Sequence, residues 1–170
     1  MALKRRQNAA KDVNLDAMVS SGPQGAYEAL QLYRSRAIRL RTKNDLAGAM
    51  VVVVQGAKCL LTSSYENAGA ELASLLLDIF NESARDLDPE LRRHINEVDQ
   101  AFAPASPHRV EFLKGCVKWS IKYGIRELGD PLLHLTLGKC LWDLNDKSAT
   151  YHFAAGEAPE QLSQKIDDTL

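Results

Sequence analysis

The residues best suited to metal binding or nucleophilic catalysis lie too far apart in the sequence to form a recognisable site. The chain has four histidines and three cysteines: His94, His108, His134 and His152, and Cys59, Cys116 and Cys140. Zinc sites typically place their ligands at CxxC or HxxxH spacing, and no such pair occurs here. His134 and Cys140 are six residues apart, on different faces of an expected helix. The sequence therefore predicts neither a metal site nor a bound cofactor.

Sequence signatures of an enzyme are also missing. The chain contains no GxxxxGK[ST] phosphate-binding loop and no GxSxG nucleophile elbow. Cys116, with Trp119 nearby, could be considered as a nucleophile, but its apolar surroundings favour a buried structural thiol. The three cysteines are too few and too far apart for a disulfide framework, so we expect reduced thiols. These features predict a non-enzymatic, cytoplasmic protein.

Positive charge is concentrated near the start of the chain. The stretch "LQLYRSRAIRLRTKN", residues 30–44, holds four arginines and a lysine, although the whole chain has a net charge of -1. Residues 1–45 carry nine Lys or Arg and four Asp or Glu, a balance of +5, which leaves -6 for the remainder. This asymmetry indicates an electropositive end that meets an acidic partner.

Helix start signals divide the chain into short, closely connected helices. Asp88, Ser106 and Asp130 each precede a proline, which is the pattern of an N-cap followed by the first helical residue. Ser63 and Glu66 form a candidate capping box, and Gly129 suits the C-cap of the helix before it. The expected helices are 3–19, 25–43, 45–62, 64–83, 88–102, 107–124, 130–144, 146–155 and 159–170, with a Ser/Gly/Pro loop at 20–25.

The helix predicted over 25–43 separates its arginines into two groups. Its apolar face carries Ala26, Leu30, Tyr33, Ala37 and Leu40. Arg36, Arg39 and Lys43 share the opposite face, whereas Arg34 and Arg41 lie at the margin of the apolar stripe. For Arg36 and Arg39 we favour a solvated face.

The fold class follows from this pattern: all-α, an α-solenoid of about nine helices stacked as antiparallel hairpins, forming a single repeat domain over 1–170. The run Val51–Val54 favours a strand by propensity, but no second strand or hairpin turn flanks it, so we predict a buried helix. The strict 34-residue tetratricopeptide signature is absent. We expect the later aromatics to pack in the core: Trp119, Tyr123, Trp142, Tyr151 and Phe153.

An ordered set of segments resembles the Golgi-to-ER traffic protein 4 family, an adaptor family in tail-anchored protein targeting. The segments include "AYEALQLYRSRAIRL", "AGAELASLLLDIF", "RVEFLKGCVKWSIKYG", "GDPLLH" and "ATYHFAAGEAPEQL". The resemblance covers residues 26 to about 165. The family's "YYEAHQ" run is altered here at Ala26 and Leu30, and family members are roughly twice as long. The chain therefore resembles the N-terminal half of that family.

The resemblance implies a docking function. The family's N-terminal half binds the targeting ATPase, of the Golgi-to-ER traffic protein 3 type, and favours its ATP-bound closed dimer. Its C-terminal half binds a ubiquitin-like partner. Carried over by position, the ATPase-docking residues are Lys4, Arg5, Lys11, Arg41, Lys43 and Glu71. No cofactor, nucleic acid or direct membrane insertion is implied, and no apolar stretch approaches the length of a membrane span.

Two other functions fit parts of the sequence. A helical-repeat scaffold that binds a peptide in a groove would line a concave face with ordered aromatics. A nucleic-acid-binding protein would use the basic end to contact phosphates. The net charge of -1 and the lack of aromatics interleaved with the arginines argue against nucleic acid.

Overall fold

The computed structural model describes residues 15–156, and between these residues it contains helices and no strand. Residues 15–20 are helical and belong to the first predicted helix. The following helices are α2 (Pro23–Thr42), α3 (Leu46–Thr62), α4 (Glu66–Ser83), α5 (Pro89–Ala101), α6 (Pro107–Tyr123), α7 (Pro131–Asp143) and α8 (Ala149–Ala155). The all-α prediction is confirmed, and the valine run lies inside α3. The helix predicted over 159–170 lies outside the described residues.

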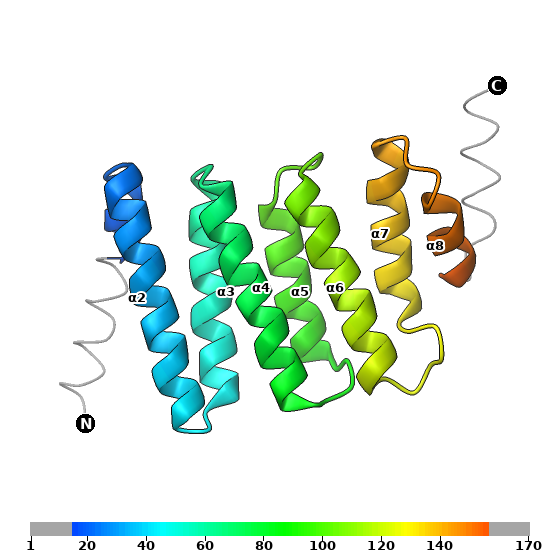
Figure 1. Cartoon of the computed structure of the whole chain (residues 1–170), viewed down its shortest axis with the longest axis horizontal. Coiled ribbons are helices and arrows are strands. Elements are labelled where there is room, and N and C mark those ends of the chain that lie inside the picture. Colours follow the sequence, from blue (N-terminus) through cyan, green and yellow to red (C-terminus); the bar gives the residue numbers. More distant parts are fainter. Residues whose placement is uncertain (1–14, 157–170) are drawn as a thin grey trace.

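Successive helices run antiparallel and stack side by side along the long axis of the molecule (Figure 1). α2, α4 and α6 form one layer, in which α4 touches both neighbours, while α3 and α5 touch each other in the second layer. α7 packs against α6 and α8. Each helix thus buries its apolar face against its neighbours in the chain and in its layer, as in an α-solenoid.

The three predicted proline-linked N-caps are confirmed. The side chain of Asp88 accepts a hydrogen bond from the Leu91 N–H, and that of Ser106 accepts from two N–H groups of the first turn of α6. Asp130 accepts from the Leu133 N–H. These bonds satisfy backbone donors that have no partner inside the helix, so they fix where α5, α6 and α7 begin.

Two of the other predicted end signals are wrong. Ser63 is the C-cap of α3, and α4 begins after Tyr65 without a side-chain cap, so Ser63 and Glu66 form no capping box. α6 ends at Tyr123 with Gly124 as its C-cap, and Gly129 instead lies just before the N-cap of the next helix with a φ of 87°. A Cβ atom at Gly129 would lie 2.6 Å from the Ser120 Oγ, so the residue also permits a close approach to α6.

The predicted loop over 20–25 is shorter than expected because Pro23 is the first residue of α2. Gly22, with a φ of 125°, makes the turn that lets proline occupy this position. The same Pro-at-the-first-position rule that located α5, α6 and α7 applies here, with glycine in place of a capping side chain.

Most of the predicted core aromatics are buried. Trp119 and Phe153 are fully buried, and the Trp119 ring lies 5.0 Å from that of Phe80 on α4. Tyr123 and Trp142 are partly buried against the core. Tyr151 is the exception, because 56% of its surface is exposed, and its prediction as a core residue is wrong.

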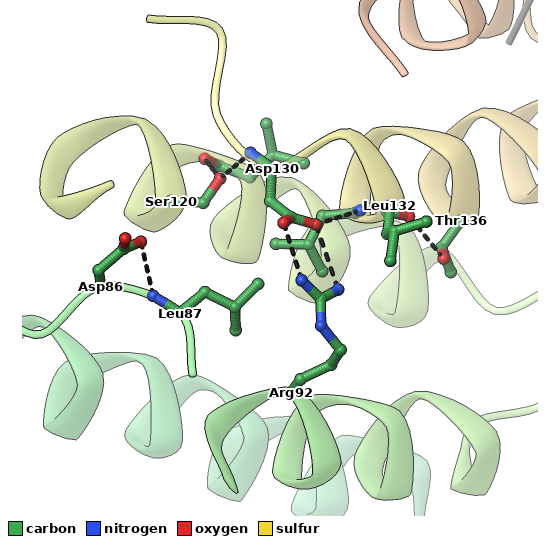
Figure 2. A network of polar contacts seen from close by, with 9 residues as sticks. Asp86, Leu87, Arg92, Ser120, Asp130, Leu132 and Thr136 are labelled. Atoms are coloured by element: carbon green, nitrogen blue, oxygen red, sulfur yellow. Dashed lines mark hydrogen bonds and ion pairs between the residues drawn. The ribbon is translucent and has the colours of Figure 1, made fainter. Parts of the chain in front are cut away.

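A polar network fastens α5, α6 and α7 together (Figure 2). The Arg92 guanidinium donates to both carboxylate oxygens of Asp130, at 3.2 and 2.8 Å. The backbone N–H of Asp130 donates to the Ser120 hydroxyl at 3.0 Å. Burial opposes the charged carboxylate, but the Arg92 and Leu133 hydrogen bonds outweigh it and hold the pKa of Asp130 below its usual value. One side chain therefore caps α7 and ties it to α5.

Replacing Asp130 should destabilise the fold more than replacing a residue that only caps a helix. We expect Asp130→Ala to lower the free energy of unfolding by about 2 to 3 kcal/mol, since it removes a cap and a charge-assisted hydrogen bond. The matched control is Asp45→Ala, which removes only the cap of α3 and should cost about 1 kcal/mol. Urea unfolding measures both. Equal losses would show that the Arg92–Asp130 pair adds no stability.

One buried histidine is left without a polar partner. His94 on α5 is 3% exposed, and neither ring nitrogen has a hydrogen-bond partner among the described residues. Burial, together with the nearby charge of Arg93, lowers the pKa of His94 below its ordinary value of 6.5. The folded protein therefore holds this imidazole neutral.

This histidine makes the fold sensitive to acid. Well above pH 6.5 the ring is neutral in both states, but as the pH falls through this value the unfolded chain binds a proton more readily than the folded chain. We expect the urea midpoint to fall as the pH is lowered from 7.5 to 5.5, and to fall less in His94→Leu. Equal pH dependence in the two proteins would show that His94 does not contribute.

Candidate protein-docking surface

Two ion pairs connect the neighbouring helices α2 and α4. The Arg34 guanidinium donates to the Glu71 carboxylate, and the Arg41 Nε donates to Glu82 Oε2 at 2.8 Å. We call these four residues the α2–α4 ion-pair ladder. Its side chains are 30 to 45% exposed, so the ladder lies at the surface.

Helix geometry explains why both pairs form on one surface. Arg34 and Arg41 are seven residues apart, which is two turns, and Glu71 and Glu82 are eleven apart, which is three turns. Residues at these spacings share one face of a helix. Because α2 and α4 run in the same direction in one layer (Figure 1), the basic edge of one meets the acidic edge of the other.

Two of the predicted docking residues, Arg41 and Glu71, belong to the ladder. Lys43 is exposed at the C-cap of α2, two residues beyond Arg41. Glu71 is exposed in the second turn of α4, opposite Arg34 rather than Arg41. Arg34 and Arg41 are about 10 Å apart along the axis of α2, so these groups lie along an edge and do not form a tight cluster. Lys4, Arg5 and Lys11 lie outside the described residues.

The arginines of α2 fall into two groups, as the helical period predicted. Arg34 and Arg41 face α4, and Arg39 is exposed. Arg36 is only half-exposed and is in contact with another residue, so the solvated face expected there is incomplete. Arg34 and Glu82 were missed as members of the surface. The sequence does contain a signal for them. Two arginines seven residues apart share one face of α2, and two glutamates eleven residues apart share one face of α4.

The cysteines provide no reactive nucleophile. All three are free; Cys116 and Cys140 are buried and Cys59 is half-buried. Burial raises the pKa of Cys116, and burial together with Asp16 raises that of Cys59 to about 11. Both thiols therefore stay protonated at neutral pH. Within residues 15–156, no group of three or more His, Cys, Asp or Glu side chains could hold a metal ion.

A polar hollow lies beside the start of the described chain. It is lined by the half-buried Cys59 and by residues from 15–20, α2 and α3: Asp16, Ser20, Tyr33, Gln55, Lys58 and Thr62. Tyr33 is the single aromatic in this lining, and it is itself buried. The ordered aromatics that a peptide-binding groove would need do not line this hollow.

The ladder should contribute little to stability, because exposed ion pairs are solvated in both states. A double-mutant cycle with Arg41→Ala and Glu82→Ala should give a coupling free energy of about 0.2–1 kcal/mol. The Lys58–Glu97 pair, which is similarly exposed, provides the matched comparison. Unfolding of the four proteins in urea measures the coupling. A value above about 2 kcal/mol would mean that Arg41 is held by the fold and is not available to a partner.

Comparisons with known proteins agree with the fold. The chain is 29% identical over 141 residues to the Golgi to ER traffic protein 4 homolog of Oryzias latipes, covering 82% of this chain and 43% of that protein. It is 31% identical over 128 residues to the homolog of Homo sapiens, covering 75% and 39%. A crystal structure of Get4 from C. therm. matches with a TM-score of 0.83 and 30% identity, covering 89% of this chain and 50% of that one.

The chain thus spans less than half the length of these curated relatives. None of the helices between residues 15 and 156 combines the length and apolar character needed to traverse a bilayer. The model of the family Golgi to ER traffic protein 4 matches residues 43–166, most of the sequence. The chain belongs to the Golgi to ER traffic protein 4 family.

Proposed function

We propose that this chain is a non-enzymatic adaptor in the post-translational targeting of tail-anchored membrane proteins to the endoplasmic reticulum. It docks on the targeting ATPase, of the Golgi-to-ER traffic protein 3 type, and favours the ATP-bound closed state. The docking surface comprises Arg41, Lys43 and Glu71, together with Lys4, Arg5 and Lys11. Membership of the family supports the pathway.

The observation that carries the docking surface is the exposed ladder between α2 and α4. Arg41 and Glu71 already form ion pairs, with Glu82 and Arg34 respectively. Such exposed pairs are worth little, so both side chains can exchange their partner for one on another protein. Lys43 adds an exposed positive charge at the C-terminal end of α2. The surface thus presents positive and negative side chains at fixed positions. Such a pattern orients an incoming partner more than it increases the affinity.

Preference for the ATP-bound state follows from binding to one conformation. A protein that contacts the closed ATPase dimer better than the open one shifts the population toward the closed state by the ratio of its two affinities. An adaptor of this kind needs no catalytic residue of its own. The ubiquitin-like partner belongs to the C-terminal half of the longer family members, and the site of action is the cytoplasm.

Charge reversal on α2 tests the docking surface. The variant Arg41→Glu/Lys43→Glu should bind the ATP-bound ATPase roughly tenfold more weakly, which corresponds to about 1.4 kcal/mol. The loss should shrink as the salt concentration rises, because these charges are exposed to solvent. Isothermal titration calorimetry with and without ATP measures the affinity and the nucleotide preference.

The matched control is Arg93→Glu, a charge reversal on α5 in the other layer, at a side chain that is 64% exposed. This variant should bind as the unaltered protein does. Unchanged binding by the α2 variant would reject the docking surface. Equal binding with and without ATP would reject the proposed action on the ATPase.

A further inference from the structure

Two histidines that are eighteen residues apart meet between α7 and α8. The Nδ1 atoms of His134 and His152 lie 2.8 Å apart, and the rings stack with centroids separated by 5.1 Å. The second nitrogen of His134, Nε2, lies 2.6 Å from the carbonyl oxygen of Leu128. His134 is 1% exposed, and His152 is half-buried.

These contacts determine which nitrogen carries each proton. A carbonyl can only accept, so the His134 Nε2 carries a proton and donates it to Leu128. The Nδ1 of neutral His134 is then a lone-pair acceptor, and His152 must donate its Nδ1–H to it. One further proton can be added at His152 Nε2 without breaking this N–H···N bond. A second added proton has to go on His134 Nδ1, where two N–H groups would face each other.

The histidine pair lies in the contact between α7 and α8, and this contact stabilises α8. α8 has only seven residues, too few to be stable without tertiary contacts. Among the described helices it packs chiefly on α7. Phe153 is fully buried there, and a Cβ atom at Gly138 would lie 3.0 Å from its ring. The histidine pair adds a polar side-chain link between the two helices.

The surroundings disfavour charge on His152. Burial, the neighbouring His134 and Lys114 on α6 lower the pKa of His152, and Asp146, which precedes α8, opposes them. The Tyr151 ring lies edge-on to both imidazoles, with centroids 6.0 Å from His134 and 5.1 Å from His152. These surroundings favour the neutral form of His152, the form that donates its Nδ1–H to His134.

We propose that His134 and His152 form a proton-controlled latch, which holds α8 on α7 while at most one imidazole is charged and releases α8 when both are charged. Release uncovers the apolar surface of α7 under Phe153. The latch acts on the last described helix and does not involve the ladder on α2 and α4.

The protonation pattern can be measured directly in the unaltered 170-residue chain. Long-range ¹H–¹⁵N spectra of the imidazoles at pH 7.5 should show His134 protonated at Nε2 and His152 protonated at Nδ1. The opposite tautomers, or charge on both imidazoles at this pH, would overturn the proposal without any mutation.

Hydrogen exchange tests the release. Protection of the α8 amides, corrected for the intrinsic effect of pH, should fall at least about tenfold between pH 7.5 and 5.0, while α3 amides lose less. His152→Asn keeps a donor at the Nδ1 position but cannot titrate, so it should retain α8 protection at pH 5.0. His152→Ala has no donor, so it should lose protection at both pH values.

The matched control is His108→Asn, which removes an exposed histidine on α6 and should leave the pH dependence of α8 unchanged. Parallel loss of protection in α8 and α3 would assign the acid effect to global unfolding through His94 and reject the latch. The same pH dependence in His152→Asn as in the unaltered protein would reject it as well.

Discussion

The close approach of α2 and α4 to α3 at Gly56 is the constraint on which the rest of the molecule depends. A Cβ atom at this position would lie 2.7 Å from both the Tyr33 ring on α2 and the Leu72 side chain on α4. Only a residue without a side chain lets both helices converge on α3 at the same level. Because they converge, α2 and α4 become neighbours in one layer, and the arginines of one helix reach the carboxylates of the other.

The electrostatics of the docking surface follow from that convergence. The excess positive charge of the first 45 residues is partly matched within the fold, since Arg34 and Arg41 meet Glu71 and Glu82. Docking through this surface then replaces ion pairs within the chain by ion pairs to the partner. Each exposed pair contributes little free energy, so the exchange costs little. Such an exchange favours orientation and rapid association, and it makes the interaction depend on salt.

Local signals in the sequence were sufficient to predict most of the helices, but they could not predict which helices contact each other. Asp88, Ser106 and Asp130 each act within four residues, so their roles could be predicted from the sequence. The Ser63–Glu66 prediction failed because a tight turn at Ser64, with a φ of 66°, places the start of α4 after Tyr65.

The partners of Arg34 and Arg41 are 37 and 41 residues away in the chain. They depend on which helices share a layer, and the spacing along one helix does not contain that information. The histidine pair is the same kind of contact, made between α7 and α8. The exposure of Tyr151 follows from the position of α8, which has a neighbour on one side only among the described helices.

Both apolar burial and polar side-chain links hold the described helices together. α3, α4 and α6 are packed between neighbours, and their buried residues are almost all apolar. α2 and α8 lie toward the two ends of the described stack (Figure 1), and each is also linked to its neighbour by polar side chains. In a solenoid each element is stabilised mainly by the elements next to it, so an end element depends more on each remaining contact. Salt therefore weakens the exposed ladder on α2, and acid acts both on the histidine pair that holds α8 and on the buried His94 of α5.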